Sequence, residues 1–152
     1  MTSPGPTSQD RRALIDTSAF FALIDNRDDN HKEARAISKR LAIESWDLFT
    51  TNFVLAEVHA LTLSRLGRSV ALRALTEIER SPSTNVIRAP IAVEEEARAI
   101  LATYSDKDFS LTDAISFSIM ERWGISSAFT FDRNFTQYGF VPLRPEMSEQ
   151  PA

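Results

Sequence analysis

The 152-residue chain contains no cysteine, and this absence excludes several classes of protein. Disulfide-rich scaffolds, zinc sites with thiolate ligands and enzymes with a cysteine nucleophile all require that side chain. The chain also lacks an apolar run of the roughly 18 residues that span a bilayer, and no apolar signal segment stands at its N-terminus. We therefore expect a cytoplasmic protein without membrane contacts.

An excess of positive charge is also absent. The net charge is −4 and the isoelectric point is near 5.2, so the bulk charge does not predict a broad nucleic-acid-binding surface or direct DNA binding. An anionic substrate must therefore be attracted by local groups. Solvated helix faces are the more common explanation for the basic side chains that could supply such charge, which are Arg27, Lys32, Arg65, Arg68, Arg73, Lys107 and Arg133.

Histidine and serine do not form familiar catalytic patterns in this sequence. His31 and His59 lie on separate segments without a His-Glu-x-x-His motif, so we expect surface or packing roles for both. Ser18 has no Ser-His-Asp context, and capping of the following helix is the simpler role.

An apolar content of 43% over 152 residues fits one domain with a substantial core. Strand-like segments are expected at 13–16, 47–51, 85–88, 128–131 and 140–143. Helical segments are expected at 19–24, 31–43, 53–66, 70–79, 93–104 and 111–123. This alternation predicts an α/β fold with right-handed crossovers, a mostly parallel sheet of about five strands and helices on both faces. Pro142 favours an edge position for the last strand.

Two helical segments are unusually apolar. Residues 19–24 are too apolar for a surface helix, so we expect burial on several sides. The segment 53–66, with Asn52 as the predicted N-cap and Gly67 at its end, has apolar side chains around more of its circumference than one buried stripe requires. Part of that surface is expected to contact another subunit; its apolar residues are Phe53, Val54, Leu55, Val58, Leu61 and Leu63.

Four acidic residues interrupt or end apolar segments, and they are the main functional signal. Asp16 and Asp132 end strand-like runs, where residues of a parallel sheet line the ligand crevice. Glu57 and Asp113 lie within helix-like segments. Because an unpaired buried carboxylate is costly, a cation or hydrogen bonds must compensate, and the set suggests a metal site.

Each acid also has a structural alternative. Asp16 and Asp132 fit ordinary turn or N-cap positions, and Asp113 fits the start of a helix, where it would complement the dipole. Glu57 would fit an ion pair with Arg65 or Lys107. These roles remain open for each acid taken alone, but the occurrence of all four together favours a shared site.

The motifs around the acids resemble those of the PIN-domain family. They are Ile15-Asp16-Thr17-Ser18, the segment from Asn52 to Glu57, Leu111-Thr112-Asp113-Ala114, and Thr130-Phe131-Asp132-Arg133-Asn134-Phe135. The resemblance covers residues 13–143, which we take as the domain, with flexible ends at 1–12 and 144–152. The small format is most similar to VapC-type toxins.

This resemblance implies a three-layer α/β/α fold and a metal-dependent ribonuclease, a hydrolase that leaves a 5′-phosphate and a 3′-hydroxyl. It further implies an RNA substrate, a cognate antitoxin protein and a homodimer. A housekeeping PIN-domain RNA-processing nuclease is the nearest alternative. A receiver-like signalling domain fits less well, because its adjacent acidic pair and late lysine are not visible, and a catalytically silent module would not keep all four acids.

Oxygen ligands of this kind suit Mg²⁺ or Mn²⁺, and Mg²⁺ retains several waters while it takes only a few carboxylates directly. We expect Asp16 and Asp113 to contact the metal directly, Asp132 directly or through water, and Glu57 to orient or deprotonate a metal-bound water. The hydroxyl groups expected to hold the carboxylates or their waters in place belong to Thr17, Ser18, Thr112 and Thr130.

Overall fold

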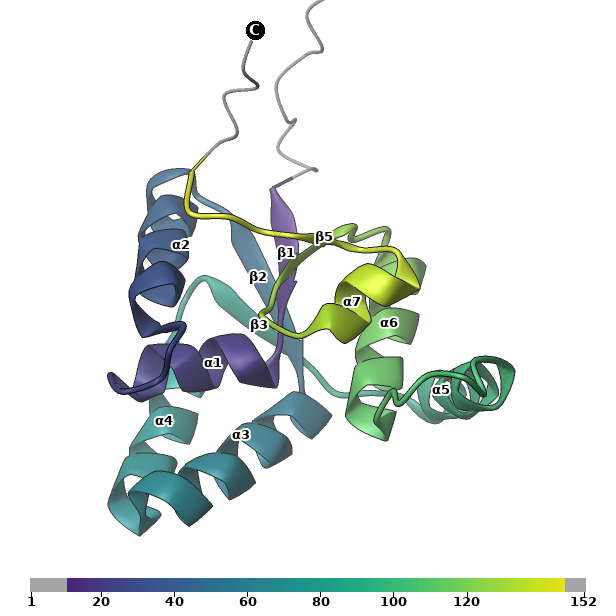
Figure 1. Cartoon of the computed structure of the whole chain (residues 1–152), viewed down its shortest axis with the longest axis horizontal. Coiled ribbons are helices and arrows are strands. Elements are labelled where there is room, and N and C mark those ends of the chain that lie inside the picture. Colours follow the sequence, from purple (N-terminus) through teal and green to yellow (C-terminus); the bar gives the residue numbers. More distant parts are fainter. Residues whose placement is uncertain (1–10, 147–152) are drawn as a thin grey trace, which may run out of the picture.

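Figure 1 shows the computed structural model of the protein, a central sheet flanked by helices. The structure describes residues 11–146. The strands are β1 (Arg12–Ile15), β2 (Asp47–Thr51), β3 (Thr84–Ile87), β4 (Ser127–Phe129) and β5 (Val141–Pro142). The helices are α1 (Thr17–Ile24), α2 (His31–Ile43), α3 (Asn52–Leu66), α4 (Arg68–Arg80), α5 (Ile91–Thr103), α6 (Leu111–Trp123) and α7 (Arg133–Tyr138). The expected flexible ends fall largely on 1–10 and 147–152, outside the described residues.

The five strands form one sheet in the order β3-β2-β1-β4-β5, and every neighbouring pair is parallel. This arrangement confirms the predicted α/β class and strand number. β5 is an edge strand and contains Pro142, as expected for a residue that has no N–H to donate to a further strand. None of the helices within residues 11–146 is long and apolar enough to cross a membrane.

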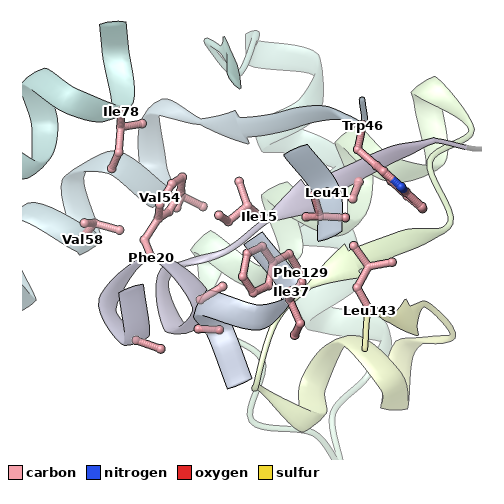
Figure 2. Packing of buried hydrophobic residues seen from close by; sticks show 14 of the residues in the cluster. Ile15, Phe20, Ile37, Leu41, Trp46, Val54, Val58, Ile78, Phe129 and Leu143 are labelled. Carbon is pink, nitrogen blue, oxygen red and sulfur yellow. The ribbon is translucent and has the colours of Figure 1, made fainter. Parts of the chain in front are cut away.

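Alternate residues of β1 serve the two faces of the sheet, as the pleat of a strand requires. Ala13 and Ile15 belong to a core cluster with residues of α1, α2, α3 and α4, and Figure 2 shows Ile15 among the side chains of that cluster. Leu14 belongs to a second cluster that includes Phe117 of α6 and Phe135 of α7. The result is a three-layer molecule with a core on each side of the sheet.

The start of the long helix α3 corrects one sequence prediction. Asn52 was the predicted N-cap, but Thr51 has this role, because its Oγ1 accepts a hydrogen bond from the Val54 N–H at 3.1 Å. Asn52 Oδ1 instead accepts from the N–H of Ala89, beyond the end of β3, at 2.9 Å. Asn52 therefore uses its side chain for a contact with a residue 37 positions away, and not for the cap that the local sequence predicts. Gly67 ends α3 as predicted, with a φ of 92°.

The strand order fixes where a site can form. β2 and β3 lie on one side of β1, whereas β4 and β5 lie on the other. The strand order therefore reverses between the neighbouring strands β1 and β4. In open α/β sheets, ligands bind beyond the carboxyl ends of the strands at such a reversal. The short helix α7, which the sequence patterns did not predict, begins directly at this edge.

Candidate active site

Two of the four acids follow the adjacent strands β1 and β4. Asp16 comes directly after β1, and its N–H donates to the carbonyl oxygen of Phe129, the last residue of β4, at 3.2 Å. The two loops are joined again beyond the strands, where the Phe131 N–H donates to Ser18 Oγ at 2.9 Å. Asp132 follows Phe131, so both carboxylates stand at the point of chain reversal.

A cavity of about 170 Å³ opens at this edge, and all four predicted acids line it. Asp16 and Asp132 come from the strand ends, Glu57 from α3 and Asp113 from the first turn of α6. The complete lining is Asp16, Thr17, Ser18, Val54, Glu57, Leu61, Thr112, Asp113, Ser116, Asp132 and Phe135. Four separate elements therefore bring carboxylates to one small space.

Asp16 is the most deeply buried of the four acids, with 5% of its surface exposed. Its Oδ1 accepts hydrogen bonds from Ser18 Oγ at 2.8 Å and from the Ala19 N–H at 3.2 Å, while its Oδ2 accepts from Thr130 Oγ1 at 2.8 Å. Burial nevertheless raises the pKa of the Asp16 carboxyl from 3.8 to about 7, and the negative charge of Asp132 adds to this effect. The three hydrogen bonds oppose the shift without cancelling it.

Asp113 is held at the third position of α6 by a reciprocal pair of bonds. Its N–H donates to Ser110 Oγ at 3.0 Å, and its Oδ2 accepts from the Ser110 N–H at 3.1 Å. The same Oδ2 accepts from Asn134 Nδ2 of α7 at 3.0 Å. Burial raises the pKa of the Asp113 carboxyl above its usual value, and the negative charge of Asp132 adds a smaller increase.

Glu57 differs from the other three acids because its side chain is exposed, at the rim of the cavity. Within residues 11–146 its carboxylate forms neither a hydrogen bond nor an ion pair. The two suggested partners are engaged elsewhere, since Lys107 pairs with Asp106 and Arg65 lies over the ring of Phe21. The structural ion-pair interpretation of Glu57 is therefore wrong.

The structural alternatives for the other acids are present, but they do not compete with a shared site. Asp16 caps α1, Asp132 caps α7 through its bond from the Asn134 N–H at 2.9 Å, and Asp113 completes a capping box. Each carboxylate has lone pairs left after its capping bonds and still faces the cavity. Capping thus fixes the direction of these side chains.

The predicted hydroxyl residues surround the same acids. Thr17, Ser18 and Thr112 line the cavity, and Thr130 supports Asp16 from behind it. Thr130 Oγ1 also accepts the N–H of Asp132 at 2.9 Å, so a single hydroxyl joins the two strand-end acids.

The donor set fits a hydrated divalent cation better than a fully coordinated one. Within residues 11–146, no three acidic or histidine side chains approach closely enough to ligate one ion together. Mg²⁺ usually keeps several waters and takes one or two carboxylates, which these four acids around one cavity would supply. Burial raises the pKa values of both Asp16 and Asp113, as expected where uncompensated negative charge is disfavoured.

Two residues of the site were given no role in the sequence analysis, although Asn134 lies within one of the quoted motifs. Asn134 fixes Asp113 to α7, and Ser116 lines the cavity one turn after Asp113. The spacing of three residues between Asp113 and Ser116 would have placed both on one helix face. Asn134 had no such signal, because its contact with Asp113 joins two helices 21 residues apart in sequence.

Comparisons with known proteins bear on the family of this chain. A family model described as the PIN domain matches residues 13–141. The chain is 35% identical over 134 residues to the "23S rRNA-specific endonuclease VapC20" of Mycobacterium tuberculosis, covering 88% of this chain and 98% of that protein. It is 27% identical over 132 residues to "Ribonuclease VapC26" of the same species, covering 87% and 92%.

Solved structures give the same result for the fold. The crystal structure of M. tuberculosis VapC20, described as a sarcin-ricin loop cleaving toxin, matches with a TM-score of 0.79 and 33% identity over 88% of this chain and 99% of that one. A toxin-antitoxin complex from Klebsiella pneumoniae matches in fold alone, with a TM-score of 0.59 and 19% identity over 88% and 98%. The chain therefore belongs to the PIN-domain family, with VapC ribonucleases among its relatives.

Proposed function

We propose that this protein is a divalent-metal-dependent endoribonuclease and the toxin of a VapBC-type toxin–antitoxin pair. The observation that carries the proposal is the convergence of Asp16, Glu57, Asp113 and Asp132, from four elements, on one cavity at the carboxyl edge of the sheet. The similarity to VapC20 along nearly its whole length supports the same activity class. No observation favours the housekeeping nuclease or the signalling domain.

In this proposal Asp16 and Asp113 would contact Mg²⁺ or Mn²⁺ directly. Asp132 would act through water, since no three acids among residues 11–146 approach closely enough to ligate one ion together. A bound cation lowers the pKa of a bound water and stabilises the charge that develops on the phosphate. Glu57 accepts a proton from the attacking water. Its carboxylate is available for this role because it has no ion-pair partner among residues 11–146. The bond from phosphorus to the 3′ oxygen then breaks, leaving a 3′-hydroxyl and a 5′-phosphate.

The buried carboxyl of Asp16 links this chemistry to pH. Burial raises the pKa of the Asp16 carboxyl to about 7, so without metal this group holds a proton at a higher pH than an exposed aspartate does. The cation must displace that proton, so metal affinity rises as the pH passes through 7. Thr17, Ser18, Thr112 and Thr130 position the carboxylates or their waters.

The substrate class is RNA, and ribosomal RNA is the first candidate. VapC20, named as specific for 23S rRNA and as a sarcin-ricin loop cleaving toxin, shares 35% of its residues with this chain over the matched length. We therefore propose a structured loop of 23S rRNA as the target, in the cytoplasm. Incubation of the purified protein with intact ribosomes and Mn²⁺, followed by sequencing of new 5′ ends, tests this; cleavage confined to tRNA or mRNA contradicts it.

An antitoxin is the proposed protein partner. The acids that attract a cation also attract arginine, which pairs with carboxylates in a bidentate manner and stays charged at cellular pH. An antitoxin segment that places Arg or Lys in the cavity would displace the metal and block cleavage. Co-expression with the neighbouring small gene should suppress toxicity and give a stable complex; an induced protein that is harmless alone, yet cleaves RNA in vitro, would favour the housekeeping alternative.

We further propose a homodimer. Part of the apolar surface of α3 and α4 remains accessible, with Leu63 at 44% and Leu72 at 58% exposure, whereas Val54, Leu55 and Val58 are buried within the chain. Subunit contact would remove such leucines from water. Light scattering at micromolar concentration should give twice the monomer mass, and a monomer would refute the assembly without affecting the proposed chemistry.

A further inference from the structure

Arg65 is an exposed arginine that is held by an aromatic ring and not by an acid. Its guanidinium carbon lies 5.4 Å from the ring centre of Phe21, a buried residue of α1. Among residues 11–146 the Arg65 guanidinium forms neither a hydrogen bond nor an ion pair. The contact with the ring uses the charge of the guanidinium but none of its five N–H donors, so these donors remain free.

Arg40 also lies over a ring, but its donors are used within the chain. Its guanidinium carbon is 5.9 Å from the centre of the Trp46 ring. Its Nε donates to the Glu44 carboxylate at 2.9 Å, and its Nη1 donates to the carbonyl oxygen of Arg144 at 2.7 Å. Arg40 therefore joins parts of the fold, whereas Arg65 is held in place with its donors available to a ligand.

Arg65 lies one helical turn beyond the acid cavity. Glu57 and Leu61 of α3 line the cavity, and Arg65 follows Leu61 by four residues, which places the three along one side of the helix. On α1, which packs beside α3 (Figure 1), Thr17 lines the cavity and Phe21 follows it by four residues. The rise of a helix puts Arg65 about 6 Å along α3 from Leu61 and about 12 Å from Glu57.

The charge around the cavity makes a free arginine at this place useful to an anionic substrate. Four carboxylates line the cavity and the chain has a net charge of −4, so an RNA strand is repelled unless cations compensate locally. A divalent ion in the cavity would compensate the phosphate that is cleaved, but not the phosphates that flank it. A guanidinium with free donors can compensate a flanking phosphate, because it pairs with phosphate oxygens through two N–H groups.

We propose that Arg65 binds a backbone phosphate that flanks the cleaved one, so that the RNA strand extends from the acids along α1 and α3. This inference rests on the proposed ribonuclease function. Arg65 takes no part in bond cleavage, and Phe21 holds its guanidinium in place before RNA binds. Because the contact is with the backbone, it positions the strand without selecting a base.

The test compares Arg65→Gln with the control Arg80→Gln. Arg80 is also exposed and without a partner among residues 11–146, but it ends α4 just before β3 begins, at the opposite edge of the sheet from the acids. Each change is combined with Asp113→Asn to prevent cleavage, and the affinity for a short fluorescein-labelled single-stranded RNA is measured by anisotropy over a series of KCl concentrations.

Arg65→Gln should bind this RNA about tenfold more weakly at low salt, since a charge-assisted contact is lost. The logarithm of its affinity should also fall less steeply with the logarithm of the salt concentration, by about 0.7 in slope, the value of one phosphate contact on a single strand. Arg80→Gln should change neither quantity. Arg65→Lys should keep the slope, because the charge remains, but lose part of the affinity with the planar fork.

The outcomes separate this inference from the proposed function. If the wild type cleaves RNA with Mn²⁺ but Arg65→Gln has the affinity and salt slope of Arg80→Gln, the phosphate contact is wrong and the ribonuclease stands. Weaker binding by Arg65→Gln with an unchanged slope would assign Arg65 a structural role beside Phe21, and this also overturns the inference. If the wild type neither binds nor cleaves RNA, both proposals fail.

Discussion

Replacement of the Asp16 carboxyl should change how stability depends on pH. In metal-free buffer, burial raises the pKa of Asp16 from 3.8 to about 7 in the folded state. A raised pKa in the folded state means that this group's contribution to stability is complete below pH 3.8 and is lost as the pH rises through 7. A difference of about three pKa units corresponds to roughly 4 kcal/mol of unfolding free energy.

The variant Asp16→Asn removes this dependence with little change of shape. The amide oxygen can still accept from Ser18 and from the Ala19 N–H, and the new amide N–H₂ can donate to Thr130 Oγ1 once that hydroxyl rotates. In EDTA, the stability of Asp16→Asn relative to the wild type should therefore increase by about 4 kcal/mol between pH 4 and pH 8.

Urea unfolding at closely spaced pH values measures the difference directly. Asp108→Asn, which removes an exposed acid outside the cavity, controls for the loss of one negative charge. Two profiles that run parallel from pH 4 to pH 8 for the wild type and Asp16→Asn would refute the reasoning, because the Asp16 carboxyl would then not be destabilised by burial. Saturating Mn²⁺ should reverse the difference at pH 8, since only the wild type gains the ion's binding energy.

Three further substitutions test separate parts of the account. Glu57→Gln should lower single-turnover RNA cleavage by about 10²–10⁴-fold if Glu57 is the base. Its urea midpoint should stay at the wild-type value, because the carboxylate is exposed and has no partner in the described part of the chain. Asn134→Ala should cost about 1 kcal/mol in urea and also slow cleavage, since Asp113 loses its tie to α7; full activity would make that bond irrelevant to the site. Phe129→Ala should cost about 3–5 kcal/mol, because its fully buried ring joins β4 to the larger core, and a loss below about 1 kcal/mol would contradict that packing.

Local patterns were sufficient for most of the fold. The range predicted for α2 agrees with the structure at both ends, because its apolar spacing matches the face that Ala34, Ile37 and Leu41 bury. The range predicted for β2 also agrees at both ends. The parallel direction of the strands was predicted from the alternation of strands and helices, whereas the strand order was not. Two predictions failed. Asn52 was expected to cap α3, but its side chain binds the N–H of Ala89 instead. The helix α7 was not predicted, and it is only six residues long.

For the site as well, local sequence features were predicted and contacts between distant residues were not. The positions of Asp16, Asp113 and Asp132 were visible from strand ends and a helix start, since these features are read within a few residues. The sequence did not predict whether each carboxylate has an ion-pair partner. For Glu57 this was decided by the structure, in which Lys107 and Arg65 contact other residues. Ser116 was concealed in a continuous buried run of α6, where a serine has the same appearance as a small core residue.

The most direct test of the central claim is cleavage of ribosomal RNA by the purified protein, followed by sequencing of RNA ends with Mn²⁺ and with EDTA. The wild type should cut with Mn²⁺ and leave 5′-phosphates, EDTA should abolish the cuts, and Asp113→Asn should fold normally while losing them. Cleavage that survives EDTA, or an Asp113→Asn variant that cuts at the wild-type rate, would contradict a metal-dependent site built on these four acids.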